Sequence, residues 1–252
     1  MKEAMGGWQV ESLRTTFFCS AQEENDPRLW ERLVGGPAEV IDIRPQQGVS
    51  TFTGRVDGIQ LQVIVAVGRV DLNAQPALSV QLGLPVQPDP PVAFHLPDPE
   101  AALASLTRIA TAWADSTASI ITRLAFGAEL TVPVDNLEEG YRGLGRYLPP
   151  LAALYDSETT ELLCQINRPR QSEVNPDLRI NRVTSWSVQQ LSSLELTLAP
   201  AGVQQIATTV TQHTQRLTLD ISTDAQLGPL EDASALLGEL VAHASSIASG
   251  DY

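Results

Sequence analysis

The chain has almost no lysine: Lys2 is the only one among 16 basic residues, and all the others are arginines. Acidic residues number 30, so the net charge is −14. A field of this sign repels nucleic-acid phosphates and anionic lipid headgroups. The composition therefore argues against nucleic-acid and membrane partners, whereas arginine offers planar donors that suit carboxylates and protein interfaces.

Cysteine and long apolar runs are also scarce. Cys19 and Cys164 are the only cysteines, too few for a disulfide framework, so we expect two buried free thiols and keep a bond between them as the alternative. No apolar run approaches the roughly 18 residues of a membrane span. The N-terminal MKEAMGGWQVE lacks the apolar core of a secretory signal. We therefore expect a cytoplasmic protein with a flexible tail at residues 1–7.

The motifs of common catalytic and cofactor sites are missing. The sequence has no P-loop, no glycine-rich dinucleotide fingerprint, no HExxH and no GxSxG. The histidines His95, His213 and His243 show no metal-ligand spacing. We predict no metal, no cofactor and no catalytic residue, and an enzyme with a dispersed, motif-free active site stays an alternative.

Apolar alternation and turn residues predict an antiparallel sheet in a globular chain that is 43% hydrophobic. Within residues 59–67 every odd position is apolar, which is the period of a strand with one buried face. Asp57 and Gly58 join this strand to residues 49–56 as a hairpin turn. Further strands are predicted at residues 8–19, 38–44, 69–73, 78–84, 119–132, 161–168, 178–188, 194–198 and 216–221.

Four amphipathic helices are predicted, at residues 27–34, 99–116, 136–148 and 229–247. Asp26 and Asp98 are the expected N-caps of the first two, with Pro27 and Pro99 at the first helical positions. The interior glycines of the third helix cost about 1 kcal/mol each relative to alanine, so tertiary packing must hold that helix.

The order strand, helix, four or so strands, helix occurs twice, in residues 8–116 and 117–252. We predict an α+β fold in which two β-α-β4-α halves form antiparallel sheet with all helices packed on one face. The two halves can also form one continuous domain.

This element order resembles the duplicated β-α-β4-α unit of the TATA-box-binding protein fold, over nearly the whole chain. That resemblance implies a saddle-like sheet. The N-terminal strand and the segments RLAFGAEL and LTLDI are similar to a group of sporadically distributed, uncharacterised bacterial proteins. Neither resemblance implies an activity, and no site residue is carried over from either.

The best candidate site lies within residues 161–188, where the triplet Ile-Asn-Arg occurs twice in extended segments. Alternation places Arg182 on the apolar face of the second strand, where an unpaired charge would cost several kcal/mol, so a carboxylate must meet it. If the two strands pair, Asn167, Asn181 and Arg179 form a polar patch on the open face of the sheet. The candidate binding residues are Asn167, Arg168, Arg170, Arg179, Asn181, Arg182 and Trp186.

Three interpretations of these residues stay open. Arg168 and Arg182 can bridge strands and hold Asp or Glu partners. The patch can instead recognise a peptide or protein, a role in which Trp186 is favoured because arginine and tryptophan often dominate interfaces. The third interpretation is an anionic small ligand or a nucleic acid.

The predicted function is a non-enzymatic protein-binding or assembly module of a bacterial cytoplasmic complex. It binds a protein partner, or itself, through the polar open face of the sheet. The first alternative is a nucleic-acid-associated protein that uses a saddle-like sheet, and the second is the enzyme described above.

Overall fold

The computed structural model describes residues 7–20, 26, 28–77, 95–149, 161–198 and 204–251. Residues 1–6 of the predicted tail, the predicted strand at 78–84 and most of the proline-rich segment that follows it lie outside the described residues.

Ten strands and four α-helices make up the described part of the chain. They are β1 (Gln9–Cys19), α1 (Leu29–Val34), β2 (Val40–Arg44), β3 (Val49–Val56), β4 (Ile59–Ala66), β5 (Arg69–Pro76), α2 (Pro99–Ser116), β6 (Ile121–Val134), α3 (Leu137–Leu144), β7 (Leu163–Asn167), β8 (Arg170–Gln171), β9 (Arg179–Leu198), β10 (Gln204–Thr223) and α4 (Ala233–Ala248). A short 3₁₀ helix, Pro45–Gln47, follows β2. No described helix has the length and apolarity needed to cross a membrane.

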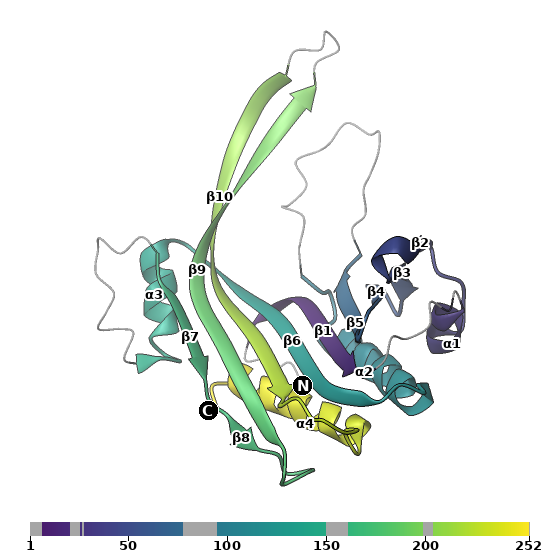
Figure 1. Ribbon diagram of the computed structural model, residues 1–252. Coiled ribbons are helices and arrows are strands. Elements are labelled where there is room, and N and C mark those ends of the chain that lie inside the picture. The colour runs from purple at the N-terminus through teal and green to yellow at the C-terminus, as the bar shows by residue number, and fades with distance from the viewer. Residues whose placement is uncertain are drawn as a thin grey trace. The chain divides into compact units, whose positions relative to one another are not determined.

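The strands belong to one antiparallel sheet with the order β2-β3-β4-β5-β1-β6-β10-β9-β7, and β8 also pairs with β9. This is the predicted α+β class (Figure 1). The chain divides into two compact units: unit 1 contains residues 1–130, 167–183 and 219–252, and unit 2 contains residues 131–166 and 184–218. Strands β6, β9 and β10 have residues in both units.

The meander β2–β5 of unit 1 confirms the predicted hairpin and buried face. Asp57 and Gly58 have φ values of 50° and 83° and connect β3 to β4, as an Asp-Gly turn requires. The odd residues of β4 are buried, from Ile59 to Val65. Val67, predicted on the same face, is exposed because β4 ends at Ala66.

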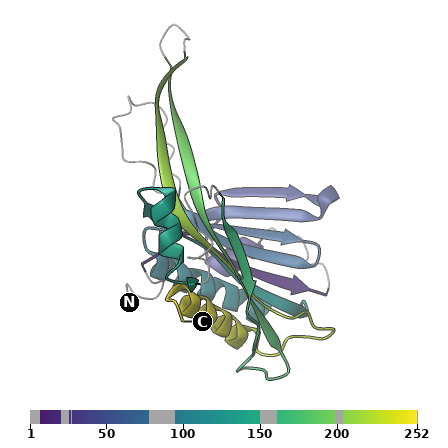
Figure 2. The ribbon, with the colours of Figure 1, turned by 90° about the vertical axis from the view of Figure 1, so that its left-hand side faces the viewer.

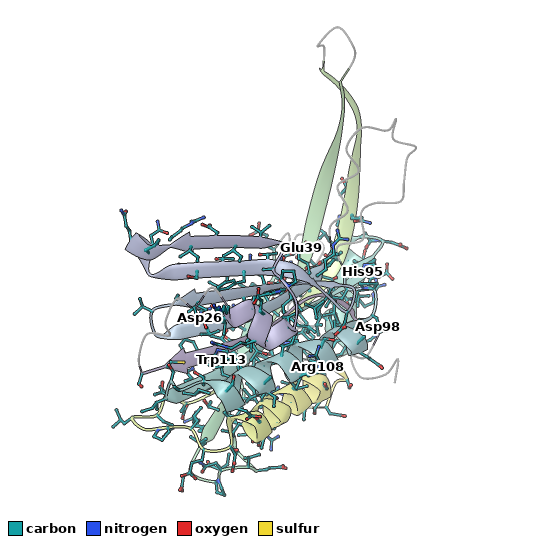
Figure 3. All side chains as sticks on the ribbon, turned by 90° about the vertical axis from the view of Figure 1, so that its right-hand side faces the viewer. Asp26, Glu39, His95, Asp98, Arg108 and Trp113 are labelled. Carbon is teal, nitrogen blue, oxygen red and sulfur yellow. The ribbon has the colours of Figure 1, made fainter. Side chains whose placement is uncertain are left out.

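Helices α2 and α4 pack against each other on one face of the unit 1 sheet, and α2 also contacts α1, β1 and β5 (Figure 2). Asp98 caps α2 as predicted, since its side chain accepts a hydrogen bond from the Ala101 N–H at 3.0 Å. The ring centroid of Trp113, a residue of α2 labelled in Figure 3, lies 4.5 Å from that of Phe17. This contact shows that Phe17, and the residues that alternate with it in β1, face the helices.

Three helix boundaries differ from the prediction. Helix α1 begins at Leu29 with Arg28 at the cap, and Asp26 instead accepts a hydrogen bond from the Arg28 N–H. Helix α3 ends at Leu144. Helix α4 begins at Ala233 rather than at 229, because Asp232 has the left-handed backbone conformation, φ 52°, which interrupts a right-handed helix.

The strands of the second half also differ from the prediction. β9 is one strand of 20 residues instead of two strands at 178–188 and 194–198, and β10 is equally long. The polar QQLSS stretch breaks the apolar alternation, but the backbone ladder to β10 does not need apolar side chains. The two-residue strand β8 lies between the predicted strands at 161–168 and 178–188, where no strand was predicted.

In unit 2, the glycines of α3 allow it to approach β9 and β10 closely. A Cβ on Gly140 would lie 2.6 Å from Cγ1 of Val188, and a Cβ on Gly143 only 1.7 Å from Nε2 of Gln215. Gln215 donates to the backbone oxygen of Gly140 at 2.9 Å. The glycines that weaken this helix in isolation therefore make its packing possible.

Candidate functional site

Strand β9 presents two different polar groups on its two faces. In unit 1 it contributes Asn181, which is half-buried, and Arg182, which is 4% exposed. Asn181 faces away from α2 and α4, on the side that we call the open face. Arg182 lies with the buried residues Leu178 and Ile180 on the helix-covered side, as the alternation predicts.

On the open face, the side chains of the two Ile-Asn-Arg triplets meet. Asn167 Nδ2 donates to Asn181 Oδ1 at 3.2 Å, and Asn181 Nδ2 donates to Asp224 Oδ1 at 2.5 Å. Asn167 Oδ1 accepts from the backbone N–H of Arg182 at 3.0 Å. The predicted pairing of the strands, and the contact of the two asparagines across it, are confirmed.

A second open-face group, which the sequence analysis missed, surrounds Asp71. This carboxylate is only 6% exposed. It accepts hydrogen bonds from Thr16 Oγ1 at 2.6 Å and from Arg69 Nη2 at 2.8 Å, and Arg69 Nε lies 2.7 Å from its other oxygen. Asp71 therefore holds the Arg69 guanidinium in a fixed orientation on β5.

Two guanidinium groups lie over one aromatic ring beside Asp71. The Cζ atoms of Arg69 and Arg123 are 5.7 and 5.0 Å from the centroid of the Phe18 ring, within cation–π range. Arg123 also donates to Ser222 Oγ at 3.0 Å. Two cations thus gather on one face of a chain whose net charge is −14.

Arg14 adds a third cation to this face. The register of β1 and β5 places Arg14, Thr16 and Phe18 opposite Asn73, Asp71 and Arg69. A Cβ on Gly127 would lie 3.5 Å from Nη2 of Arg14, an ordinary contact distance, so this guanidinium lies beside Gly127 of β6. We call the whole set the open-face belt: Arg14, Thr16, Phe18, Arg69, Asp71, Arg123, Asn167, Asn181, Ser222 and Asp224.

The helix-covered side of β9 carries a separate group around Glu239 of α4. Glu239 accepts a hydrogen bond from Ser172 Oγ at 2.6 Å through one oxygen and from the Glu173 N–H at 2.7 Å through the other. Ser172 Oγ also accepts from the N–H groups of Val174 and Asn175. Glu239 therefore fixes the turn between β8 and β9 on α4.

His243 lies one helical turn from Glu239, with its Nε2 3.8 Å from Oε1 of that carboxylate. Burial lowers the pKa of His243 below 6.5, and the positive charges of Arg182 and Arg170 lower it further, against the opposing effect of Glu239 and Glu173. Arg182, buried on the helix-covered side, is therefore one of the charges that act on His243.

The depressed pKa of His243 predicts a loss of stability in mild acid. Below about pH 6.5 the unfolded chain binds a proton that the folded chain takes up only at lower pH, so the free energy of unfolding should fall as the pH drops from 6.5 through the folded pKa. Above pH 6.5 by more than about one unit, His243 is neutral in both the folded and the unfolded chain and does not change the free energy of unfolding with pH. Thermal unfolding between pH 5 and 8 measures the effect.

The matched variant for this prediction is His243→Gln, which should unfold with a shallower acid dependence than the wild type. His95→Gln controls for the removal of a histidine elsewhere in unit 1. If His243→Gln keeps the wild-type pH dependence in this window, the acid sensitivity belongs to other groups and the prediction is wrong.

None of the remaining candidate residues belongs to the open-face belt. Arg168 directly after β7, Arg170 in β8 and Arg179 at the start of β9 are exposed. Trp186, in unit 2, is completely buried, packs 5.1 Å from the ring of Tyr147 and donates to Thr184 Oγ1 at 3.0 Å. It belongs to the core of unit 2 and has no surface that a partner could contact.

Both cysteines are free thiols, as expected. Cys19 is buried as expected, whereas Cys164 is only half-buried, so the expected burial of both thiols is wrong for Cys164. Within the residues that the structure describes, no group of three His, Cys, Asp or Glu side chains could hold a metal ion.

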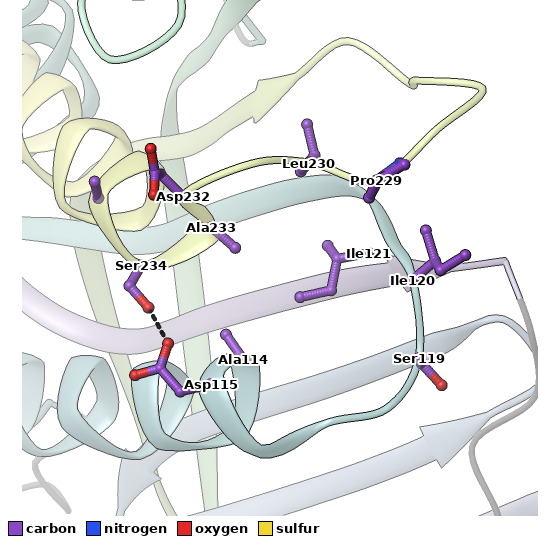
Figure 4. A pocket seen from close by; sticks show the side chains of 11 residues that line it. Ala114, Asp115, Ser119, Ile120, Ile121, Pro229, Leu230, Asp232, Ala233 and Ser234 are labelled. Carbon is purple, nitrogen blue, oxygen red and sulfur yellow. Dashed lines mark hydrogen bonds between the residues drawn. The ribbon is translucent and has the colours of Figure 1, made fainter.

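A hollow of about 550 Å³ lies in unit 1 between the end of α2, residues 119–121 and the start of α4 (Figure 4). Asp115 and Asp232 are its charged lining residues, and Asp115 accepts a hydrogen bond from Ser234 Oγ at 2.9 Å. None of its lining residues is a cation.

No protein-family model matches the sequence, and no curated protein matches it either.

Proposed function

We propose that this chain is a non-enzymatic protein-binding or assembly module of a bacterial cytoplasmic complex, and that the open-face belt binds the partner. The observation that carries the proposal is the placement of Arg69 and Arg123 over Phe18, on the face opposite α2 and α4. Arginine and aromatic side chains dominate the energetics of protein interfaces.

The arrangement of the cations favours tight and selective binding. Asp71 orients Arg69, Ser222 orients Arg123, and the Phe18 ring supports both. Side chains that are already ordered lose less entropy when a partner binds. Because the belt presents arginines, the partner surface that complements its charge presents carboxylates.

The strand order supports the proposed duplication and the resemblance to the TATA-box-binding protein fold. From the central strands outward, one side of the sheet runs β1, β5, β4, β3, β2 and the other runs β6, β10, β9, β7, with β8 also paired to β9. Each series thus starts from the first strand of a predicted half and continues with later strands of that half in descending order.

The proposal is tested by affinity purification of the tagged chain from its host, followed by mass spectrometry. A stoichiometric protein partner should appear with the wild type and fall at least about tenfold in the variant Arg14→Glu/Arg123→Glu, because like charges would then face its carboxylates. The control is Arg32→Glu/Arg108→Glu, an identical charge change on exposed arginines of α1 and α2; Figure 3 labels Arg108. Thermal unfolding verifies that both variants fold.

Equal capture of the partner by both double variants would overturn the role of the belt. A purification without any protein partner would overturn the protein-binding function and favour the enzyme. Binding of DNA or RNA that weakens steeply with salt, by a log–log slope of about −0.9 per phosphate contact, would favour the nucleic-acid alternative.

A further inference from the structure

Strand β2 is the last strand at one end of the sheet order and pairs with β3 alone among the described strands. Its sequence, VIDIR, exposes three apolar side chains: Val40 is 58%, Ile41 50% and Ile43 39% exposed. An edge strand has one row of unpaired backbone N–H and C=O groups, and natural proteins protect such edges by keeping the strand short or with charged side chains, proline or a bulge. β2 is short and carries Asp42 and Arg44, but no lysine or proline lies within it.

The exposed isoleucines continue the buried face of the sheet. Ile41 is paired with Phe52, which is paired with Val63, which in turn faces Leu72. The other three residues of this row are almost completely buried. The apolar row therefore runs to the edge and ends there half-covered, as it would if a further strand belonged beside β2.

We infer that β2 pairs with β2 of a second copy of this chain, antiparallel and with the twofold axis through Ile43. In this register the two Ile43 side chains are opposite each other. Asp42 is then opposite Arg44 of the second copy, and Arg44 is opposite its Asp42. Both cross-strand pairs join opposite charges, which stabilise antiparallel neighbours.

Neighbouring registers lack this complementarity. An axis through Asp42 sets the two Asp42 carboxylates against each other, and an axis through Ile41 leaves Asp42 opposite Val40. Within one chain, Arg44 Nη2 already lies 2.6 Å from Asp42 Oδ2, so the two charged groups share one face of β2. Asp42 and Arg44 must lie on one face of β2 for each of them to meet the oppositely charged residue of the second copy.

The contact is short, because an axis through Ile43 pairs only residues 42–44 of β2 with residues 42–44 of the second copy, and the 3₁₀ helix begins at Pro45. It is smaller than the interfaces of permanent dimers, so we expect a weak, reversible dimer. The inference does not rest on the open-face belt and does not use any of its residues.

Sedimentation velocity of the full chain over a range of concentrations tests the inference. The wild type should convert reversibly between monomer and dimer. Asp42→Arg and Arg44→Asp should each weaken the dimer by about tenfold or more, because each variant makes both cross-strand pairs repulsive. The double variant Asp42→Arg/Arg44→Asp restores opposite charges and should return to within about threefold of the wild type.

Val67→Asp is the control, because Val67 is an exposed apolar residue outside β2 and should leave the dimer unchanged. The inference is overturned by a wild type that stays monomeric at all concentrations, by single variants that dimerise like the wild type, or by a double variant that fails to recover. A monomeric wild type that captures another protein through β2 would assign the edge to a foreign strand and equally overturn it.

Discussion

Replacing Trp186 by alanine is expected to lower the free energy of unfolding by about 3–5 kcal/mol. The indole is completely buried in unit 2, and its removal leaves a cavity beside the Tyr147 ring and leaves Thr184 without its donor. Urea unfolding followed by circular dichroism measures the loss. A change below about 1 kcal/mol would show that the site collapses around the cavity, against this prediction.

Trp186→Phe separates packing from hydrogen bonding at the same position. The phenyl ring keeps most of the contact with Tyr147 but cannot donate to Thr184. We expect it to lose about 1–2 kcal/mol, well below the alanine variant, if packing is the larger contribution.

Arg182→Ala is the second substitution with a large expected effect, a loss of about 3 kcal/mol or more in the free energy of unfolding. The side chain is 4% exposed on the helix-covered side of β9, and its charge acts on His243 together with those of Glu239 and Glu173. Its removal leaves a cavity on this buried side of the strand and takes away a positive charge that acts on His243. Chemical unfolding of the purified variant is the measurement.

Two companion variants sharpen that result. Arg182→Met keeps most of the side-chain volume and so leaves a smaller cavity. Its loss of unfolding free energy should therefore be smaller than that of the alanine variant. Arg179→Ala, three residues earlier on the same strand but exposed, should change stability by no more than about 0.5 kcal/mol. Equal stability of Arg182→Ala and Arg179→Ala would sink the assignment of Arg182 as a structurally important buried charge.

Local patterns in the sequence predicted much of the fold. The alternation in 59–67 gave β4 and its buried face, Asp57 and Gly58 gave the hairpin, and Asp98 followed by Pro99 gave the start of α2. Each of these features depends on residues that are adjacent in the chain. Their conformational preferences act before any tertiary contact forms.

The candidate site was predictable only where two neighbouring strands carry it. The repeated Ile-Asn-Arg triplets pointed to the contact between Asn167 and Asn181, and the alternation predicted that Arg182 is buried. The cations of the open-face belt were missed, although Arg14, Thr16 and Phe18 occupy alternate positions of the predicted strand at 8–19. Their partners come from β5, β6 and β10, and no spacing along the chain reveals which strands become neighbours.

The sequence by itself determined the α+β class, the acidic character of the chain and the periodic faces of its strands and helices, because composition and period are properties of short segments. The tertiary structure alone decided that Arg69 and Arg123 share Phe18, that Glu239 holds the β8–β9 turn, and that Ile41 and Ile43 end a buried row at an open edge. These arrangements depend on strand order and register. Both are fixed by the packing of the whole sheet, which joins residues far apart in the chain.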